Sequence, residues 1–404
     1  MTRRTAYLVD GIRTPFGKYA GGLSGIRPDD LLAGVVRHLL NRSGIPFEAV
    51  GELVTGCVNQ SGEDNRNIAR MVVLLAGLPV STPAITVNRL CASGLSALTY
   101  AAKSVITGDQ EIVVASGVES MSRAPYVFAK STKAFQRPAP ELFDTSIGWR
   151  FTNPRFSQTY PPLEMGETAE RVASVFKVSR EDQDEFANES HKRCVEAYER
   201  GAYSKHVIPV NQLGDFFSDI ECDLEIDESI RSNTNLKSLS NLKSAFIKNG
   251  TVTAGNSSPL SDGAAALIVA SEDACNKLGL RPIAQFVSSG VAGVDPSLMG
   301  IGPVPATKIA LRKAEWRIQD LDIFEINEAF AAQIIAVQRE LQIPSESLNQ
   351  NGGAIAIGHP LGATGIRLAL TAMSRMAESN GRSRALLSAC IGVGQGESIL
   401  LEKC

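Results

Sequence analysis

The feature that most constrains the fold is a set of three motifs that occurs near the start of the chain and recurs in the same order near its end. Each copy has an apolar strand ending in a polar turn (residues 54–59 and 323–328), a glycine-bearing turn leading into a helix (90–96 and 358–365), and a small-residue strand with a turn (113–118 and 387–394). Alternating helices and nearly continuous apolar strands are typical of a parallel or mixed α/β sheet. We therefore predict a duplicated α/β unit, with a site where the two copies face each other.

Local periodicity supports this arrangement in the first copy. Residues 51–58 and 111–117 are short apolar runs that predict buried strands. Between them, residues 95–106 carry apolar side chains at helical spacing, and Gly108 marks the predicted end of that helix. An apolar run at residues 84–88 predicts a further strand that leads into the same helix.

Between the two copies the character of the sequence changes. Residues 130–162 are rich in Pro, Ser, Thr and aromatic residues with little periodicity, and a charged helical stretch follows from Ser179, with Asp182 three residues on. A long irregular segment in a compact protein is usually functional. We predict a first α/β half at residues 1–123, an inserted loop domain at 124–251, a return to the first half at 252–275 and a second half at 276–404.

Composition excludes several classes of partner. The 404-residue chain has a net charge of −3, a pI near 5.9 and no basic run, so neither nucleic acid nor a membrane surface is an expected partner. No stretch approaches the roughly 18 apolar residues that span a bilayer. The first apolar run, residues 6–10, is too short for a signal peptide and predicts a strand. A cytoplasmic protein is expected.

The cysteines and histidines limit the possible chemistry. The seven cysteines form no CxxC pair, which argues against both a disulfide framework and a zinc site, so we expect no metal. There are only four histidines, at positions 38, 191, 206 and 359, so a mechanism that needs two clustered histidines is hard to build.

Cys91 is the first candidate catalytic residue. It lies between the strand at residues 84–88 and the helix that begins near Ser93, where the helix dipole is expected to lower the thiol pKa. Small neighbours leave room for a substrate carbonyl, as in strained strand–turn–helix elbows. The alternative is a buried structural cysteine at a helix start.

Three more residues lie in turns that suit a site. His359 stands in a glycine-dense loop, which allows a large ligand to approach the backbone, and is a candidate base or a structural histidine. Cys390 ends an apolar strand and enters a glycine turn, so on its own it would be a core cysteine. Asn327 lies where a strand becomes a helix and would, on its own, be read as an N-cap.

Together these four motifs resemble the active-site loops of the thiolase superfamily, in that family's order. The resemblance runs from Ala6 to Glu402 and includes four further segments. These are Gly117-Val-Glu-Ser-Met-Ser-Arg123, Met165-Gly-Glu-Thr-Ala-Glu170, Gly250-Thr-Val-Thr-Ala-Gly-Asn256 and Met299-Gly-Ile-Gly-Pro-Val-Pro305. It implies the thiolase fold: an α/β class with two duplicated βαβαβαββ halves in a layered αβαβα core and an inserted loop domain.

The resemblance also implies a mechanism. Cys91 would attack the 3-keto carbon of a 3-oxoacyl-CoA with His359 as its base, and Cys390 would exchange the proton on the acetyl-CoA carbon. The enolate oxygen would be held by His359 and a water fixed on Asn327. The tetrahedral oxyanion would use the backbone N–H groups of Cys91 and Gly392. Coenzyme A and acetyl-CoA would be substrates, and no tightly bound cofactor is implied.

By the same resemblance, the insertion and its neighbours would bind coenzyme A. Its contacts would be Arg231, Phe246, Ala254 and Ser258, with a solvated surface charge as the alternative for Arg231. The acyl pocket would be lined by Met165, Met299, Ala329 and Phe330. The family often has a histidine where Glu164 stands, which puts that pantetheine contact in doubt. A homo-oligomer, either a dimer or a dimer of dimers (homotetramer), is also implied.

Several segments resemble the 3-oxoadipyl-CoA thiolases of aromatic-compound degradation, notably residues 62–70 and Asp144-Thr-Ser-Ile-Gly-Trp-Arg-Phe151. Two departures are Gly166, where that subgroup usually has proline, and Asn256-Ser-Ser-Pro-Leu-Ser-Asp262, which is more like straight-chain 3-ketoacyl-CoA thiolases. A dicarboxylic substrate needs a cation or several hydrogen-bond donors for its distal carboxylate. The candidates are Arg66, Arg123 and Arg150, which could instead tie the insertion to a partner subunit.

Other functions remain as alternatives. The substrate could be acetoacetyl-CoA or a straight-chain 3-ketoacyl-CoA, and neither the direction nor the pathway follows from the sequence. A ketoacyl synthase would need a second histidine where Cys390 stands. A cysteine hydrolase would not need the second cysteine. A non-catalytic CoA-ester or lipid carrier with this fold would be expected to lose the four active-site residues.

Overall fold

The computed structural model describes residues 4–214, 217 and 222–404, and its core is a ten-stranded mixed sheet wrapped around two helices. The first half of the chain supplies five strands and three helices of this core. They are β1 (Ala6–Arg13), α1 (Pro28–Ser43), β3 (Glu52–Gly56), α2 (Ile68–Leu75), β4 (Ala84–Val87), α3 (Ser93–Thr107), β5 (Ile112–Ser120) and β8 (Ser261–Ser271). The short strand β2 (Gly17–Lys18) pairs with β8 at the edge of this half.

The second half repeats that order of elements. It contains β9 (Ala284–Gly293), α9 (Pro303–Ala314), β10 (Ile323–Ile326), α10 (Ala331–Leu341), α11 (Ala354–Ile357), α12 (Leu361–Glu378), β11 (Arg384–Ile391) and β12 (Gln395–Lys403). The helix α8 (Glu272–Leu278) connects the halves.

The strand order confirms the predicted duplication. The sheet reads β10-β11-β12-β9-β1-β8-β5-β3-β4, so the run β3-β5-β8-β1 in one half corresponds to β10-β11-β12-β9 in the other. The counterpart of β4 is reduced to a single parallel bridge between Phe324 and Leu348. The halves join where Tyr7 and Leu8 of β1 pair with β9.

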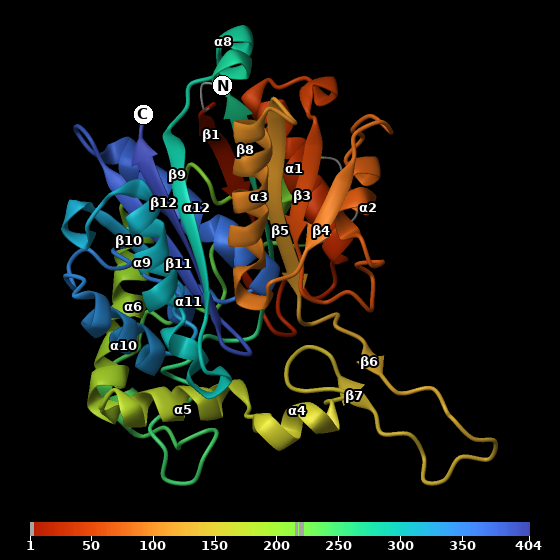
Figure 1. Cartoon of the computed structure of the whole chain (residues 1–404), viewed down its shortest axis with the longest axis vertical. Helices are drawn as coiled ribbons and strands as arrows, with labels where there is room; N and C mark the ends of the chain where they lie inside the picture. The colour runs from red at the N-terminus through yellow and green to blue at the C-terminus, as the bar shows by residue number, and fades with distance from the viewer. Residues whose placement is uncertain (1–3, 215–216, 218–221) are drawn as a thin grey trace.

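The helices form three layers around the two halves of the sheet, which matches the αβαβα expectation (Figure 1). Helices α1 and α2 cover the outer face of the first half, and α9 and α10 cover that of the second. Helices α3 and α12 lie between the two, since α12 contacts β5 and β8 as well as β10 and β11.

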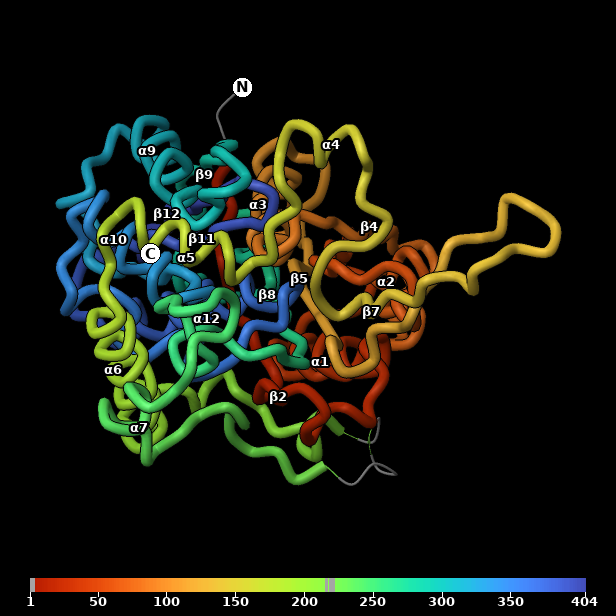
Figure 2. The backbone as a smooth tube through the Cα atoms, turned by 90° about the horizontal axis from the view of Figure 1, so that it is seen from below, coloured from red at the N-terminus to blue at the C-terminus, as the bar shows by residue number. Residues whose placement is uncertain are grey.

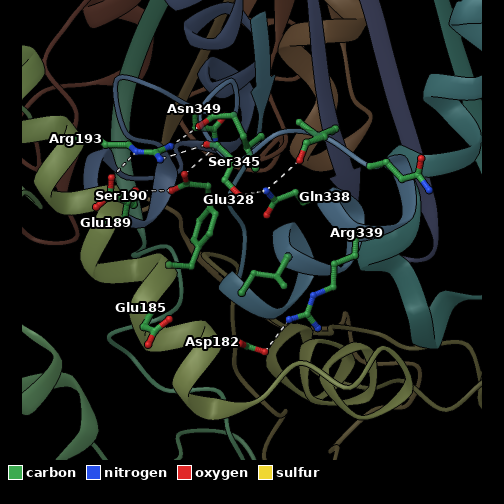
Figure 3. Close-up of a pocket in the computed structure, with 15 residues that line it drawn as sticks. Asp182, Glu185, Glu189, Ser190, Arg193, Glu328, Gln338, Arg339, Ser345 and Asn349 are labelled. Carbon is green, nitrogen blue, oxygen red and sulfur yellow. Dashed lines mark hydrogen bonds and ion pairs between the residues drawn. The ribbon is translucent and has the colours of Figure 1, made fainter. Parts of the chain in front are cut away.

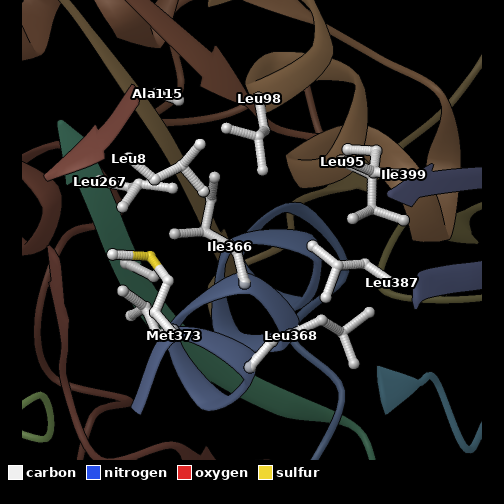
Figure 4. Close-up of a cluster of buried hydrophobic side chains, with 14 of the residues drawn as sticks. Leu8, Leu95, Leu98, Ala115, Leu267, Ile366, Leu368, Met373, Leu387 and Ile399 are labelled. Atoms are coloured by element: carbon white, nitrogen blue, oxygen red, sulfur yellow. The ribbon is translucent and has the colours of Figure 1, made fainter. Parts of the chain in front are cut away.

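The largest core cluster fills this middle layer. Leu98 of α3 and Ile366 and Met373 of α12 pack between side chains of both halves, such as Leu267 of β8 and Leu387 of β11 (Figure 4). These side chains are fully or almost fully buried. Burial of a whole Leu or Ile side chain contributes about 1.5–3 kcal/mol, so this layer holds the two halves together.

The described part of residues 124–251 forms four α-helices, of which α5 and α6 run along the second half. They are α4 (Pro154–Thr159), α5 (Met165–Val175), α6 (Arg180–Glu199) and α7 (Leu236–Ser240). Ser179 accepts the N–H of Asp182 and so caps α6, as the sequence predicted. Helices α5 and α6 pack on α10. The chain between β6 (Tyr126–Val127) and β7 (Phe143–Asp144) projects away from the body in both views (Figure 1 and Figure 2).

Candidate active site

Cys91 lies in a tight turn between β4 and α3. The turn is a single 3-10 segment, Leu90–Ala92, and Leu90 has a left-handed backbone with φ of 47°. Such a conformation is uncommon for a bulky residue and costs of order 1–3 kcal/mol, so the surrounding fold must impose it. Ser93 supports the turn, because its hydroxyl accepts the N–H of Arg89 at 2.9 Å and donates to the Leu90 carbonyl at 2.8 Å.

Glycines allow a close crossing of the two helices that follow Cys91 and His359. The N-termini of α3 and α12 cross in direct backbone contact at Gly94 and Gly365. A Cβ atom on Gly365 would lie 2.5 Å from the carbonyl carbon of Gly94, and one on Gly94 would lie 2.7 Å from the carbonyl oxygen of Gly362. No larger residue fits at this crossing without moving one of the helices.

His359 lies in the short turn between α11 and α12, and its ring is held at both nitrogens. Nδ1 lies 2.7 Å from Oγ1 of Thr364, whose hydroxyl donates to the Pro360 carbonyl at 2.9 Å. The threonine oxygen is therefore the acceptor of an Nδ1–H, which leaves Nε2 without a proton. Nε2 lies 3.2 Å from the side-chain nitrogen of Asn327. The backbone N–H of His359 donates to Ser261 at 3.1 Å.

Burial sets the ionisation state of the two central groups. It lowers the pKa of His359 to about 3, with a smaller contribution from Arg367, so the imidazole is neutral at pH 7. Burial raises the pKa of Cys91 to about 11 and outweighs the N–H groups of Gly392 and of Cys91 itself. The prediction of a lowered Cys91 pKa is therefore wrong for the free protein, because desolvation exceeds the effect of the helix start.

The other sequence motifs converge on the same place. Gly392, in the turn after β11, directs its backbone N–H at the Cys91 sulfur. Cys390 at the end of β11 is fully buried among Met299, Ala329 and Phe330. Burial raises its thiol pKa well above the ordinary value, and the nearby Cys91 adds to this shift. Asn327 is anchored by its N–H to Ser388 at 2.8 Å, and its Oδ1 is buried without a partner in the described structure.

These groups surround a cavity of about 460 Å³. Cys91, His359 and Gly392 lie in its wall, and so do all four residues predicted for the acyl pocket, namely Met165, Met299, Ala329 and Phe330. Most of its wall is apolar, which suits an acyl chain. The arrangement offers a thiol, a neutral imidazole and inward N–H groups around one space, as acyl transfer requires.

Comparisons with known proteins agree with this geometry. Two family models, the thiolase N-terminal domain and the thiolase C-terminal domain, match residues 6–273 and 280–403. The chain belongs to the thiolase family. Members of this family are acyltransferases, and this chain is therefore an enzyme of that class.

Named relatives and solved structures match over the whole chain. A beta-ketoadipyl-CoA thiolase of Escherichia coli is 50% identical over 99% of this chain and 100% of its own. One from Pseudomonas aeruginosa is 47% identical, with 99% of each chain covered. The crystal structure of human mitochondrial 3-ketoacyl-CoA thiolase in complex with CoA superposes with a TM-score of 0.91 at 38% identity, covering 99% of this chain and 98% of that one.

The residues predicted to contact coenzyme A are spread from the cavity wall to the surface. Ser258 lines the cavity, and its hydroxyl donates to the Ala329 carbonyl at 3.1 Å. Phe246 is not in the wall but packs edge-on against Phe330, with ring centroids 6.1 Å apart. Ala254 and Arg231 are exposed, and the Arg231 backbone donates to Nδ1 of His191 at 3.2 Å. Their roles as coenzyme A contacts stay predictions.

Two site residues of this thiolase were missed at the sequence level. Thr364 orients His359, and its signal is a hydroxyl residue five positions after the histidine in the same glycine-rich loop. Glu119 lies in the cavity wall and accepts the backbone N–H groups of Val58, Asn59 and Gly362 at 2.9–3.0 Å. Its carboxylate thereby ties the start of α12 to the first half, while burial raises its pKa to about 7.

A second cavity of about 530 Å³, lined largely by polar residues, lies between α6 and α10 (Figure 3). At its floor Glu328 accepts hydrogen bonds from Ser190 at 2.7 Å, Asn349 at 2.8 Å and the Ile355 N–H at 3.2 Å. Because Glu328 follows Asn327 and Ile355 lies four residues before His359, this carboxylate fixes the loops of Asn327 and His359 relative to each other.

The three candidate arginines differ in their position relative to the active-site cavity. Arg123 forms two hydrogen bonds with Glu63, at 2.5 and 2.6 Å, outside the cavity. Arg66 is exposed and does not line it either. Arg150 lines the cavity.

Two wider expectations concern membranes and metals. Among the residues that the structure describes, no helix has the length and apolar character to cross a bilayer. In the same residues, no group of three or more His, Cys, Asp or Glu side chains is arranged to hold a metal ion.

Proposed function

We propose that this thiolase cleaves 3-oxoadipyl-CoA with free coenzyme A, giving acetyl-CoA and succinyl-CoA through an acyl-enzyme on Cys91. The observation that carries the proposal is the convergence of Cys91, His359 and the Gly392 N–H on one cavity, with Cys390 packed in its apolar floor. The full-length relatives named for beta-ketoadipyl-CoA support the choice of substrate.

The first step is the attack of the Cys91 sulfur on the 3-keto carbon. With a thiol pKa near 11 and an imidazole pKa near 3, the free enzyme holds a neutral pair rather than an ion pair. The thiol proton therefore passes to Nε2 of His359 as the sulfur attacks, which is general-base catalysis. The backbone N–H groups of Cys91 and Gly392 stabilise the oxyanion. Thr364 keeps the acceptor nitrogen turned towards the thiol.

The second step breaks the bond between carbons 2 and 3. The electron pair becomes the enolate of acetyl-CoA, and Cys390 gives its thiol proton to that carbon. A high thiol pKa suits this role, because Cys390 stays protonated until the enolate forms. Asn327 supports the enolate oxygen, since its buried and unpartnered Oδ1 can hold a water there. Coenzyme A then attacks the Cys91 thioester and loses its thiol proton to the Cys390 thiolate. His359 returns its proton to the departing Cys91 sulfur, which restores both thiols.

We further propose that the segment at residues 124–251 binds the coenzyme A tail, with halves at 1–123 together with 252–275 and at 276–404. Ser258 on the cavity wall and Phe246 at its edge support a path for pantetheine out towards the exposed Arg231 and Ala254. Coenzyme A is thus a substrate and not a resident cofactor. The free state of all seven cysteines supports a reducing compartment, in line with the predicted cytoplasmic location.

A homo-oligomer completes the proposal. In the described part of the chain β4 has no neighbour on its outer side, and exposed apolar side chains lie around it. They are Leu74, Leu75, Val80, Ile85 and Tyr100. The projecting chain between β6 and β7 carries the fully exposed Phe135 and the exposed Phe128 and Leu142. Apolar surfaces of this kind mark protein interfaces, which supports a dimer or a dimer of dimers.

The test is a coenzyme A-dependent cleavage assay that compares three substrates by the acetyl-CoA released. We expect the highest kcat/KM with 3-oxoadipyl-CoA. A clear preference for acetoacetyl-CoA, or for a plain longer 3-ketoacyl-CoA, would remove the dicarboxylate assignment and leave the thiolase assignment intact. If the protein binds all three substrates but cleaves none of them, the result would favour the non-catalytic carrier. Thioester hydrolysis without carbon–carbon cleavage would favour a hydrolase.

A further inference from the structure

A dicarboxylic substrate places a second negative charge inside the active-site cavity. Burying a carboxylate without a partner is costly, so the wall must offer a cation or several donors near the end of the acyl chain. Among the residues that the structure describes, Arg150 is the only lysine or arginine that lines this cavity. The other titratable groups of the wall are the Cys91 thiol, the neutral His359, and the carboxyl groups of Glu119 and Glu164.

Arg150 has no counter-charge of its own. Its guanidinium is partly buried, and no ion pair or side-chain hydrogen bond joins it to any described residue. Glu119 is occupied by three backbone N–H groups, and Glu164 stands exposed at the cavity rim. A partly buried guanidinium without a carboxylate partner in the protein can bind the carboxylate of a ligand.

The loop that carries Arg150 is held in place on both sides. Trp149 donates its indole N–H to the Leu163 carbonyl at 2.9 Å and packs on Phe156, with centroids 5.3 Å apart. Phe151 packs on Phe143 at 5.0 Å. A receptor on an anchored loop loses little freedom when it binds, which favours specific recognition.

We infer that Arg150 receives the distal carboxylate of the substrate through two parallel hydrogen bonds and so sets the preference for a dicarboxylic 3-oxoacyl-CoA. This inference rests on the proposed function. It assigns the role to one of three candidate arginines. Arg123 already uses its guanidinium on Glu63, and Arg66 lies outside the cavity.

The test compares 3-oxoadipyl-CoA with 3-oxohexanoyl-CoA, which has the same six-carbon chain with a methyl group in place of the distal carboxylate. The readout is the ratio of the two kcat/KM values for the wild type and for Arg150→Gln. Loss of a charged two-bond contact should lower this ratio by about 10- to 100-fold, mainly through KM for 3-oxoadipyl-CoA. Arg150→Lys keeps the positive charge but cannot form two parallel hydrogen bonds, so it should give an intermediate ratio.

Arg123→Gln is the matched control, since it removes a nearby arginine that is outside the cavity, and its ratio should equal that of the wild type. Suppose that the wild type prefers 3-oxoadipyl-CoA. If Arg150→Gln keeps that preference, or if its kcat/KM falls by the same factor for both substrates, the inference about Arg150 is wrong and the proposed function stands. If the wild type itself shows no preference for 3-oxoadipyl-CoA, both the proposed substrate and the proposed role of Arg150 are wrong.

Discussion

Replacing Gly365 with alanine tests whether the crossing of α3 and α12 positions the catalytic pair. The added Cβ would lie 2.5 Å from the carbonyl carbon of Gly94 and 2.9 Å from its Cα, and it would also press on the backbone nitrogen of Leu95. All three are backbone atoms, so no side chain can rotate away. Carbon atoms prefer separations of about 3.5–4.0 Å, and the helices must therefore part by about 1 Å.

The expected effect on activity is larger than the effect on stability. Overpacking costs about 1–3 kcal/mol, and the better helix propensity of alanine returns up to about 1 kcal/mol. Parting the helices carries His359 away from Cys91, and a misplacement of about 1 Å can cost about 100-fold in rate. We therefore expect a folded protein with a modestly lower thermal midpoint and a kcat reduced by about 100-fold.

The assay measures kcat for thiolysis together with thermal unfolding, with Gly25→Ala as the control. Gly25 has no atom within 4 Å of a built Cβ and no left-handed backbone, so that variant should match the wild type in both. A Gly365→Ala enzyme with normal kcat and an unchanged thermal midpoint would refute the view that this contact sets the catalytic geometry.

Two further predictions concern the thiols. Because the pKa of Cys91 is about 11, its thiolate fraction should rise tenfold per pH unit between pH 6 and 9, and the rate of its alkylation by iodoacetamide should rise in parallel, with protection by acetyl-CoA. A rate that levels off below pH 8 would mean a preformed thiolate. Cys390→Ala should still take an acyl group on Cys91 but lose exchange of the acetyl α-hydrogens, measured by deuterium uptake. Normal exchange would contradict its role as the acid.

The duplication could be predicted from the sequence because its motifs repeat, whereas the layered αβαβα arrangement was expected from the resemblance to thiolases. Three strand and helix motifs in each half were enough to predict the duplication, and they correspond to β3, the start of α3 and β5 in one half and to β10, the start of α12 and β11 in the other. The motifs did not predict that the counterpart of β4 is reduced to a single bridge at Leu348.

The sequence predicted which residues gather at the candidate site, but it did not predict their pKa values. The motifs of Cys91, His359, Asn327 and Cys390 identified the four residues that the structure brings together. The pKa of Cys91 was predicted in the wrong direction, because the depth of the cavity outweighs the N-terminus of α3 and depth is a property of the tertiary fold. The same limit applies to Arg150. Its sequence neighbours resemble a subgroup motif, but only the structure separates it from the ion-paired Arg123.

The central claim is that the acyl group passes through Cys91, and trapping that intermediate tests it most directly. The enzyme is mixed with 3-oxoadipyl-CoA in the absence of free coenzyme A, quenched in acid and digested, and the peptides are examined by mass spectrometry. We predict a succinyl group on Cys91 and on no other cysteine, and its absence in a folded Cys91→Ser variant that has lost nearly all thiolysis. An unmodified Cys91 in the wild type, or near-normal turnover by Cys91→Ser, would contradict the mechanism.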